Sequence, residues 1–141
     1  MGVAKRKTRW WVWLVVALVA LCGLPVTLLM WGAYSFSQAG KPQPVDCAAA
    51  MQFAHGRLPA DAEEARCTEA HWQDSFVTVD FRLPRAGVAD WLETTYPGAK
   101  APASCDGDLC RDTDFGQALY VSVEVAYEGD AALVHLTAFN V

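Results

Sequence analysis

The sequence lacks the short motifs that mark the common catalytic sites. It has no glycine-rich phosphate loop, and no nucleophile-elbow motif surrounds Ser75, Ser104 or Ser122. Internal repeats and low-complexity tracts are also missing, so repeat architectures are excluded. Catalysis therefore has no support beyond the presence of suitable residue types, and no cofactor is expected.

Histidine is scarce, with three residues at positions 55, 71 and 135. Nothing in the sequence places these side chains near one another, and a lone histidine on a strand is usually a surface residue. A metal or acid–base site would need His71 and His135 to meet on paired strands, together with a carboxylate. An enzyme of this kind is one alternative for the function.

Charge is missing between Arg9 and Lys41, and residues 10–34 are the most apolar part of this stretch. A helix rises by roughly 1.5 Å per residue, so this segment exceeds the ~30 Å hydrocarbon core of a bilayer. Amphipathic rings, which settle at the headgroup level, lie at both of its ends: Trp10, Trp11, Trp13, Trp31 and Tyr34. The pattern predicts a transmembrane helix over residues 10–34, with the lipid bilayer as its partner.

Acidic residues are absent before Asp46, and four basic residues precede the apolar stretch: Lys5, Arg6, Lys7 and Arg9. The positive-inside bias then predicts a cytoplasmic basic tail at residues 1–9 and an extracytoplasmic domain at residues 46–141 of a single-pass protein of the cell membrane. A cleaved signal peptide is the alternative, with Ser37-Gln38-Ala39 as a small-x-small site. The apolar stretch exceeds the usual signal-peptide core, which favours a retained anchor, and both readings place the domain outside.

Basic residues are the minority in the part of the chain after the anchor. It holds seven Lys and Arg residues and sixteen Asp and Glu residues, which gives a formal net charge of −9. Such a surface repels polyanions, so nucleic acid is not an expected partner.

Two prolines, Pro42 and Pro44, lie in residues 35–45 and predict an extended linker. The folded domain is then expected to begin near Asp46, which can cap a short helix ending at Gly56, where a left-handed cap is allowed. Alternating apolar residues predict strands at 77–83, 119–127 and 132–141, and the weaker run at 64–71 is interpreted as a further strand.

Apolar residues at helical spacing predict a second helix over 85–96, in which Trp91 belongs to the core. The order of elements indicates an α+β domain with a four-stranded antiparallel sheet and two helices on one face.

Four cysteines follow the anchor, at positions 47, 67, 105 and 110, and an even number in an oxidising compartment predicts two disulfides. Three pairings are possible. Cys105 and Cys110 flank a glycine-containing turn, so a local bridge is geometrically easy and leaves Cys47 to pair with Cys67. A redox or zinc site is the other reading, but these spacings do not resemble those of such sites.

Carboxylates crowd one loop: Asp106, Asp108, Asp112 and Asp114. Carboxylate oxygens at alternating positions are calcium ligands, although no Glu closes a twelve-residue loop. Asp and Gly are also ordinary turn formers, so a solvated turn is the alternative.

Two aromatic residues are the candidates for an exposed binding patch. Trp72 falls in a predicted turn, and Tyr120 lies on the polar-alternating face of a predicted strand.

The segments LPADAEEARC and SFVTVDFRLPRAGVADWLETTYP follow a basic tail and a membrane helix. In this order they resemble small membrane-anchored extracytoplasmic proteins of unknown function from high-GC actinobacteria. The resemblance rests on an LP-then-Ala opening, a strand that ends in RLP and a helix with an aromatic-Leu pair, and it implies no catalytic residues.

Three hypotheses follow for the function. The first is a non-enzymatic envelope module that binds a protein or a cell-wall component, and it predicts an exposed aromatic or apolar patch. The second is a metal-dependent or hydrolytic enzyme, which needs a cleft that joins a histidine to several Asp residues. The third is a calcium-stabilised structural domain.

Overall fold

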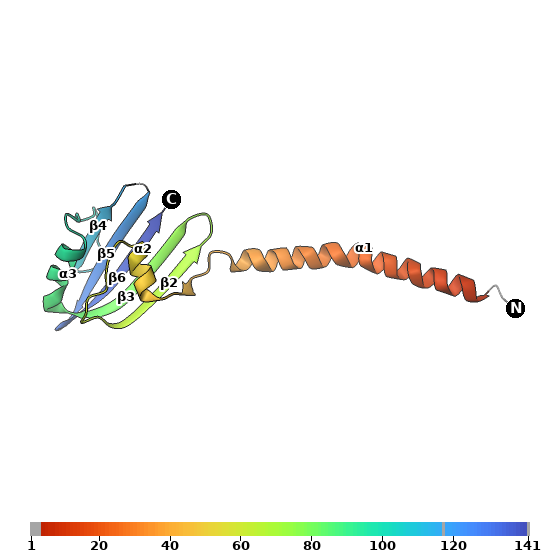
Figure 1. Ribbon diagram of the computed structural model, residues 1–141, viewed down its shortest axis with the longest axis horizontal. Helices are drawn as coiled ribbons and strands as arrows, with labels where there is room; N and C mark the ends of the chain where they lie inside the picture. Colours follow the sequence, from red (N-terminus) through yellow and green to blue (C-terminus); the bar gives the residue numbers. More distant parts are fainter. Residues whose placement is uncertain (1–3, 117, 141) are drawn as a thin grey trace. The chain divides into compact units, whose positions relative to one another are not determined.

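The computed structural model describes residues 4–116 and 118–140 of the chain (Figure 1). The chain divides into two compact units, Met1–Ala39 and Gly40–Val141, which are considered separately.

The first unit contains one helix, α1, at Ala4–Gln38. Its segment Arg9–Gln38 is long and apolar enough to cross a membrane. The helix continues through Pro25, and the Thr27 hydroxyl donates to the carbonyl oxygens of Gly23 and Leu24, each at 2.9 Å. It also extends past residue 34, so it includes the first residues of the expected linker.

The second unit contains an antiparallel sheet of six strands in the order β1-β2-β3-β6-β5-β4. The expected number of four strands was therefore wrong. The four expected strands are present as β2, β3, β5 and β6, whereas β1 lies in the expected linker and β4 in the expected cysteine loop. Their bounds are β1 Gln43–Pro44, β2 Glu63–His71, β3 Ser75–Pro84, β4 Leu109–Asp114, β5 Leu119–Glu128 and β6 Ala131–Asn140.

The two additional strands lack the features by which strands are recognised in a sequence. β1 is two residues long and contains a proline, and it is extended because it pairs with Thr68 and Glu69 of β2. β4 reads LCRDTD, in which the Asp residues indicate a turn. Its strand conformation results from antiparallel pairing with β5, the next strand along the chain.

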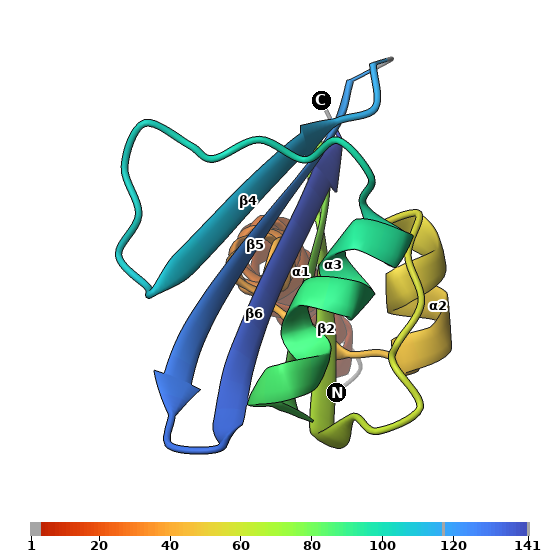
Figure 2. The ribbon, with the colours of Figure 1, turned by 90° about the vertical axis from the view of Figure 1, so that its left-hand side faces the viewer.

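Two helices lie on the same side of the sheet (Figure 2). α2 spans Cys47–Phe53, and the Asp46 carboxylate caps it by accepting hydrogen bonds from the amides of Ala48 and Ala49, at 2.9 and 3.2 Å. The second predicted helix begins as the 3₁₀ turn η1, Arg85–Gly87, and continues as α3, Val88–Thr95.

The C-terminus of α2 differs from the expectation in one residue. The left-handed residue is His55, with φ 54°, and not Gly56. The amide of Gly56 donates to the Met51 carbonyl and that of His55 to the Gln52 carbonyl, the pattern of a Schellman motif. Gly56 is required for another reason, because a Cβ there would lie 2.5 Å from the Tyr96 hydroxyl.

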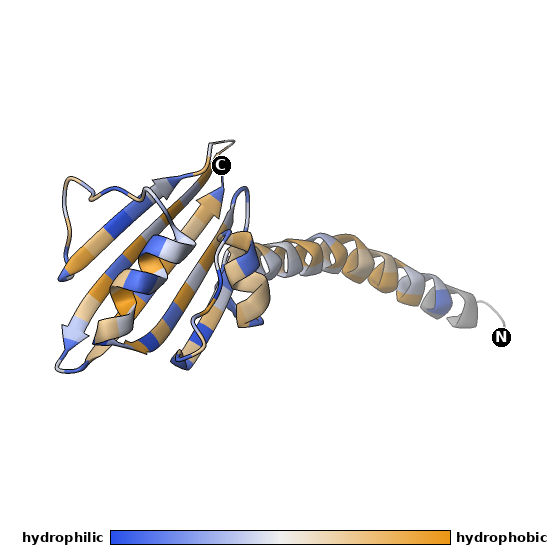
Figure 3. Ribbon diagram, turned by 60° about the vertical axis from the view of Figure 1, so that its left-hand side comes forward, coloured by the Kyte–Doolittle hydropathy of each residue, from blue (hydrophilic) through white to orange (hydrophobic). Residues whose placement is uncertain are grey.

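Apolar and polar residues alternate strictly along three strands, as the colours in Figure 3 show. The apolar residues of these strands form the core. One residue in two turns toward α2 and α3 and is buried: Val77, Val79, Phe81 and Leu83 of β3, Leu119, Val121, Val123 and Val125 of β5, and Ala132, Val134, Leu136 and Ala138 of β6. Trp91 of α3 belongs to the same core, as expected. It is 7% exposed, and its indole nitrogen donates to the Arg57 carbonyl at 2.9 Å.

The predicted cysteine pairs both lie at disulfide distance. The Sγ atoms of Cys47 and Cys67 are 2.06 Å apart and join α2 to β2. Those of Cys105 and Cys110 are 1.94 Å apart and close the turn that precedes β4. Cys22, in α1, is free.

Candidate binding surface on the open face of the sheet

The second face of the sheet carries a different set of side chains from the first. We call it the open face, because α2 and α3 both pack on the opposite side (Figure 2). Residues that pair directly across antiparallel strands share a face. By the strand register this face includes Arg66, Thr68 and Ala70 of β2, Phe76, Thr78, Asp80, Arg82 and Pro84 of β3, Ala131, Leu133, His135, Thr137 and Phe139 of β6, Tyr120, Ser122, Glu124, Ala126 and Glu128 of β5, and Cys110, Asp112 and Asp114 of β4.

An aromatic row crosses one end of the open face. Phe76 of β3 pairs with Phe139 of β6, which in turn pairs with Tyr120 of β5. The rings of Tyr120 and Phe139 have centroids 5.2 Å apart, and Phe76 is 41% exposed. Leu133 adds a further apolar side chain, 37% exposed, closer to the other end. The open face therefore offers aromatic and aliphatic surface to a partner.

The aromatic row ends at a carboxylate on the edge strand. Asp112 of β4 accepts hydrogen bonds from the Tyr120 hydroxyl and from the Ser122 hydroxyl, the latter at 2.8 Å. The bond to Asp112, followed by partial burial and the negative charges of Asp112 and Asp114, raises the pKa of Tyr120 to about 12. The hydrogen bond to Asp112 holds the Tyr120 side chain in one orientation, which limits the conformational entropy that binding would cost.

A charged row crosses the middle of the open face. Arg66, Asp80, His135 and Glu124 are paired in that order across β2, β3, β6 and β5. The Nδ1 atom of His135 lies 2.5 Å from Oδ1 of Asp80. A hollow of about 370 Å³ opens over this row, and its lining includes Arg66, Arg82, Glu124 and Leu133.

The two aromatic residues predicted as a patch lie in different places. Tyr120 is half-buried within the aromatic row, whereas Trp72 lies in the β2–β3 turn, 65% exposed. The sequence interpretation missed Phe76 and Phe139, which extend the row. Their positions alternate with the buried residues of β3 and β6. This alternation alone predicts that both side chains lie on the face opposite the core.

The four Asp residues of the candidate calcium site have separate contacts. Asp108 accepts a hydrogen bond from the Tyr127 amide, and Asp114 accepts one from the Gly116 amide, both at 2.7 Å. Asp112 is bound to Tyr120 and Ser122 on the open face, and Asp106 lies in the disulfide-closed turn. In residues 4–116 and 118–140 no group of three or more His, Cys, Asp or Glu residues is arranged to hold a metal ion.

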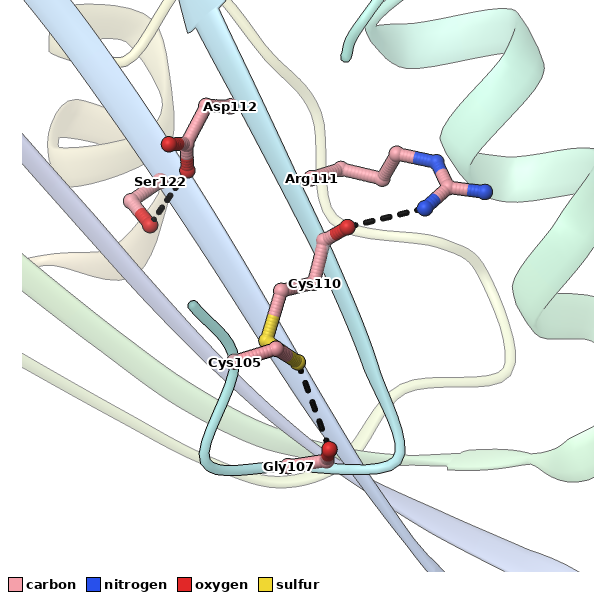
Figure 4. The surroundings of a disulfide bond; sticks show 6 residues. All are labelled: Cys105, Gly107, Cys110, Arg111, Asp112 and Ser122. Atoms are coloured by element: carbon pink, nitrogen blue, oxygen red, sulfur yellow. Dashed lines mark hydrogen bonds between the residues drawn. A yellow bond between two sulfur atoms is a disulfide. The ribbon is translucent and has the colours of Figure 1, made fainter. Parts of the chain in front are cut away.

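The disulfide turn packs closely on β5. The Cys105 sulfur lies 3.2 Å from the Gly107 carbonyl oxygen (Figure 4), which is a contact and not a donated hydrogen bond because a disulfide sulfur carries no proton. A Cβ on Gly107 would lie 2.8 Å from the Val125 carbonyl oxygen and from Cγ of Glu124. Asp112 and Arg111 point to opposite sides of β4 (Figure 4), which keeps Asp112 on the open face.

The structure does not bring the histidines together. His71 ends β2 and His135 lies in β6, with β3 between them. The Nδ1 atom of His71 lies 3.0 Å from the Ser75 hydroxyl, and its Nε2 atom lies 3.3 Å from Glu69. In a serine hydrolase of the Ser-His-Asp type these ring nitrogens have the opposite roles. The contacts lie on an exposed hairpin and amount to local polar pairing.

No protein-family model, curated protein or solved structure matches this chain.

Proposed function

We propose that this chain is a single-pass protein of the cell membrane whose second unit is a non-catalytic binding module on the outer side. Residues 1–9 are then cytoplasmic, and the open face binds an envelope protein or a cell-wall component. The charge asymmetry about α1 supports this orientation, because four basic residues precede the apolar stretch and all sixteen acidic residues follow it.

The observation that carries the proposal is the composition of the open face. A sheet face that serves only solubility bears polar residues. Beside its polar and charged residues, the open face carries the aromatic row, Phe76, Phe139 and Tyr120, and the exposed Leu133. Rigid aromatic side chains with a polar surround are typical of the anchor residues at binding interfaces.

Site-specific photo-crosslinking in intact cells tests the proposal. A photoreactive benzoyl-phenylalanine at position 139 places the probe on the open face with little change in shape. The matched control carries the same probe in place of Glu93, which is exposed on α3 on the opposite side of the sheet. We expect a discrete crosslinked species from position 139 and none from position 93.

Two results would count against the proposal. Equal crosslinking at positions 139 and 93 would mean that the open face has no special role. An absence of crosslinks at positions 139, 76 and 133, each tested as a separate variant, would remove the open face as a binding surface.

A further inference from the structure

The hollow over the charged row is lined by groups of both charge signs. Two guanidinium groups line it from neighbouring strands, Arg66 of β2 and Arg82 of β3. Asp80 lies opposite Arg66 and two residues before Arg82, so both arginines belong to the same side of the hollow. Two carboxylates line the arginine side as well, Glu64 of β2 and Asp80 of β3, and Asp80 is paired with His135 of β6. Glu124 of β5 lines the other side.

The arginines have unused hydrogen-bonding capacity. Arg66 is exposed, and among the described residues its guanidinium has no hydrogen-bond or ion-pair partner. Arg82 binds Glu128 through Nη2, but its Nε atom is buried and has no acceptor within the described chain. A buried donor without an acceptor is costly, so a ligand that draws the Arg82 guanidinium into a fully bonded position would recover free energy.

The remaining lining restricts the chemistry of the ligand. Leu133 of β6 and Ala126 of β5 add apolar lining in the cross-strand row of Arg82. A planar carboxylate matches the guanidinium fork, and an ammonium group matches the carboxylate of Glu124. The formal net charge of −9 after the anchor disfavours a polyanion, so a ligand with one charge of each sign fits better than a phosphate-rich one.

We propose that this hollow binds the free carboxylate of a short zwitterionic peptide, with Arg66 and Arg82 as the carboxylate ligands and Glu124 facing the peptide's ammonium group. The inference rests on the proposed function and names the chemical class of partner for one part of the open face. A protein C-terminus and a peptide of the cell wall share this chemistry and differ in the stereochemistry of the terminal residues.

The test uses the isotope-labelled full chain in lipid nanodiscs and the zwitterionic tripeptide L-Ala-L-Ala-L-Ala as the probe, followed by NMR. We expect shifts of the Arg82 Nε–H signal and of the amides near Leu133. The same peptide with a terminal amide should bind at least about 10-fold more weakly, because it cannot form the charge-assisted bonds. Replacing the last two residues by D-Ala-D-Ala distinguishes the sources: tighter binding of the L form indicates a protein C-terminus, and tighter binding of the D form indicates a cell-wall peptide.

Substitutions locate the site. Arg66→Gln and Arg82→Gln should each raise the dissociation constant by at least about 10-fold. Arg57→Gln removes the same charge at an exposed position in the α2–β2 loop and should leave it unchanged. An unchanged spectrum away from the hollow shows that the variants are folded.

Equal binding of the acid and the amide, or an equal effect of the Arg57 variant, would overturn the inference. Absence of binding by both stereoisomers would do the same. If position 139 still crosslinks in cells, the proposed function stands and only the peptide assignment fails.

Discussion

Asp112 and Tyr120 form a pair whose protonation can be measured. The hydrogen bond to Asp112 is the largest cause of the raised pKa of Tyr120, about 12 against an ordinary 10.0. A phenol whose pKa is higher in the folded state contributes stability that is complete below the unfolded pKa. This contribution is lost as the pH rises from about 10 to about 12.

We predict that Asp112→Asn lowers the pKa of Tyr120 toward its ordinary value, because it removes both the charge and the carboxylate acceptor. The pKa of Tyr120 is measured by NMR at increasing pH on protein with carbon-13-labelled tyrosine rings. Tyr127 provides an internal control on the same strand. If the Tyr120 resonance titrated at the same pH in the variant, Asp112 would not be the cause of the shift.

Gly56 illustrates how far one residue can be interpreted from a sequence. A glycine at the end of an Ala-rich segment indicates a left-handed cap, and the expectation placed that conformation there. The structure gives it to His55. Gly56 instead leaves room for the buried Tyr96 hydroxyl, which donates to the Ala54 carbonyl at 3.0 Å. That hydrogen bond joins α2 to α3, 42 positions apart along the chain, and no local pattern shows it.

At the scale of elements, the two disulfides should differ in their effect on stability. Cys47–Cys67 closes a loop with a sequence separation of 20, and Cys105–Cys110 one of 5. On the chain-entropy estimate, loops of these lengths correspond to about 3 and about 2 kcal/mol.

We predict that Cys47→Ser/Cys67→Ser lowers the free energy of unfolding by about 3 kcal/mol, and Cys105→Ser/Cys110→Ser by about 2 kcal/mol. Denaturant unfolding of the full chain in detergent, followed by tryptophan fluorescence, provides the measurement. Cys22→Ser, which removes a free thiol in α1, is the control and should change nothing. A larger loss from the short loop would mean that packing of the turn against β5 outweighs loop closure.

The elements found from the sequence are those with a strong pattern of their own. β3, β5 and β6 alternate strictly, and α3 repeats apolar residues at helical spacing, so each could be recognised in isolation. β1 and β4 have no such pattern, and they are extended because their backbones pair with β2 and β5. The open face was predictable as the polar side of these strands, but the row that joins Phe76 to Tyr120 depends on strand order, which a single sequence does not specify.

For the full chain, the proposed orientation in the membrane can be tested. We predict that protease added to intact cells removes an epitope tag placed at the C-terminus but leaves one at the N-terminus until the membrane is opened. Exchanging Lys5, Arg6, Lys7 and Arg9 for Gln should produce mixed orientations, because the positive-inside bias is then lost. Protection of the C-terminal tag in intact cells would reverse the assignment of sides.

The pairing of β1 with β2 has a mechanical consequence. Tension applied to Gly40–Val141 through α1 would first separate the two residue pairs of β1 and β2, together with the hydrogen bond from the Val45 amide to the Cys67 carbonyl. The force is then transmitted through the covalent Cys47–Cys67 disulfide directly to β2. It does not act on α2 or on residues 54–62, which lie inside the disulfide-closed loop. With the bridge intact, those segments are shielded from stretching, and an oxidised chain should resist a pull on its tether longer than a reduced one.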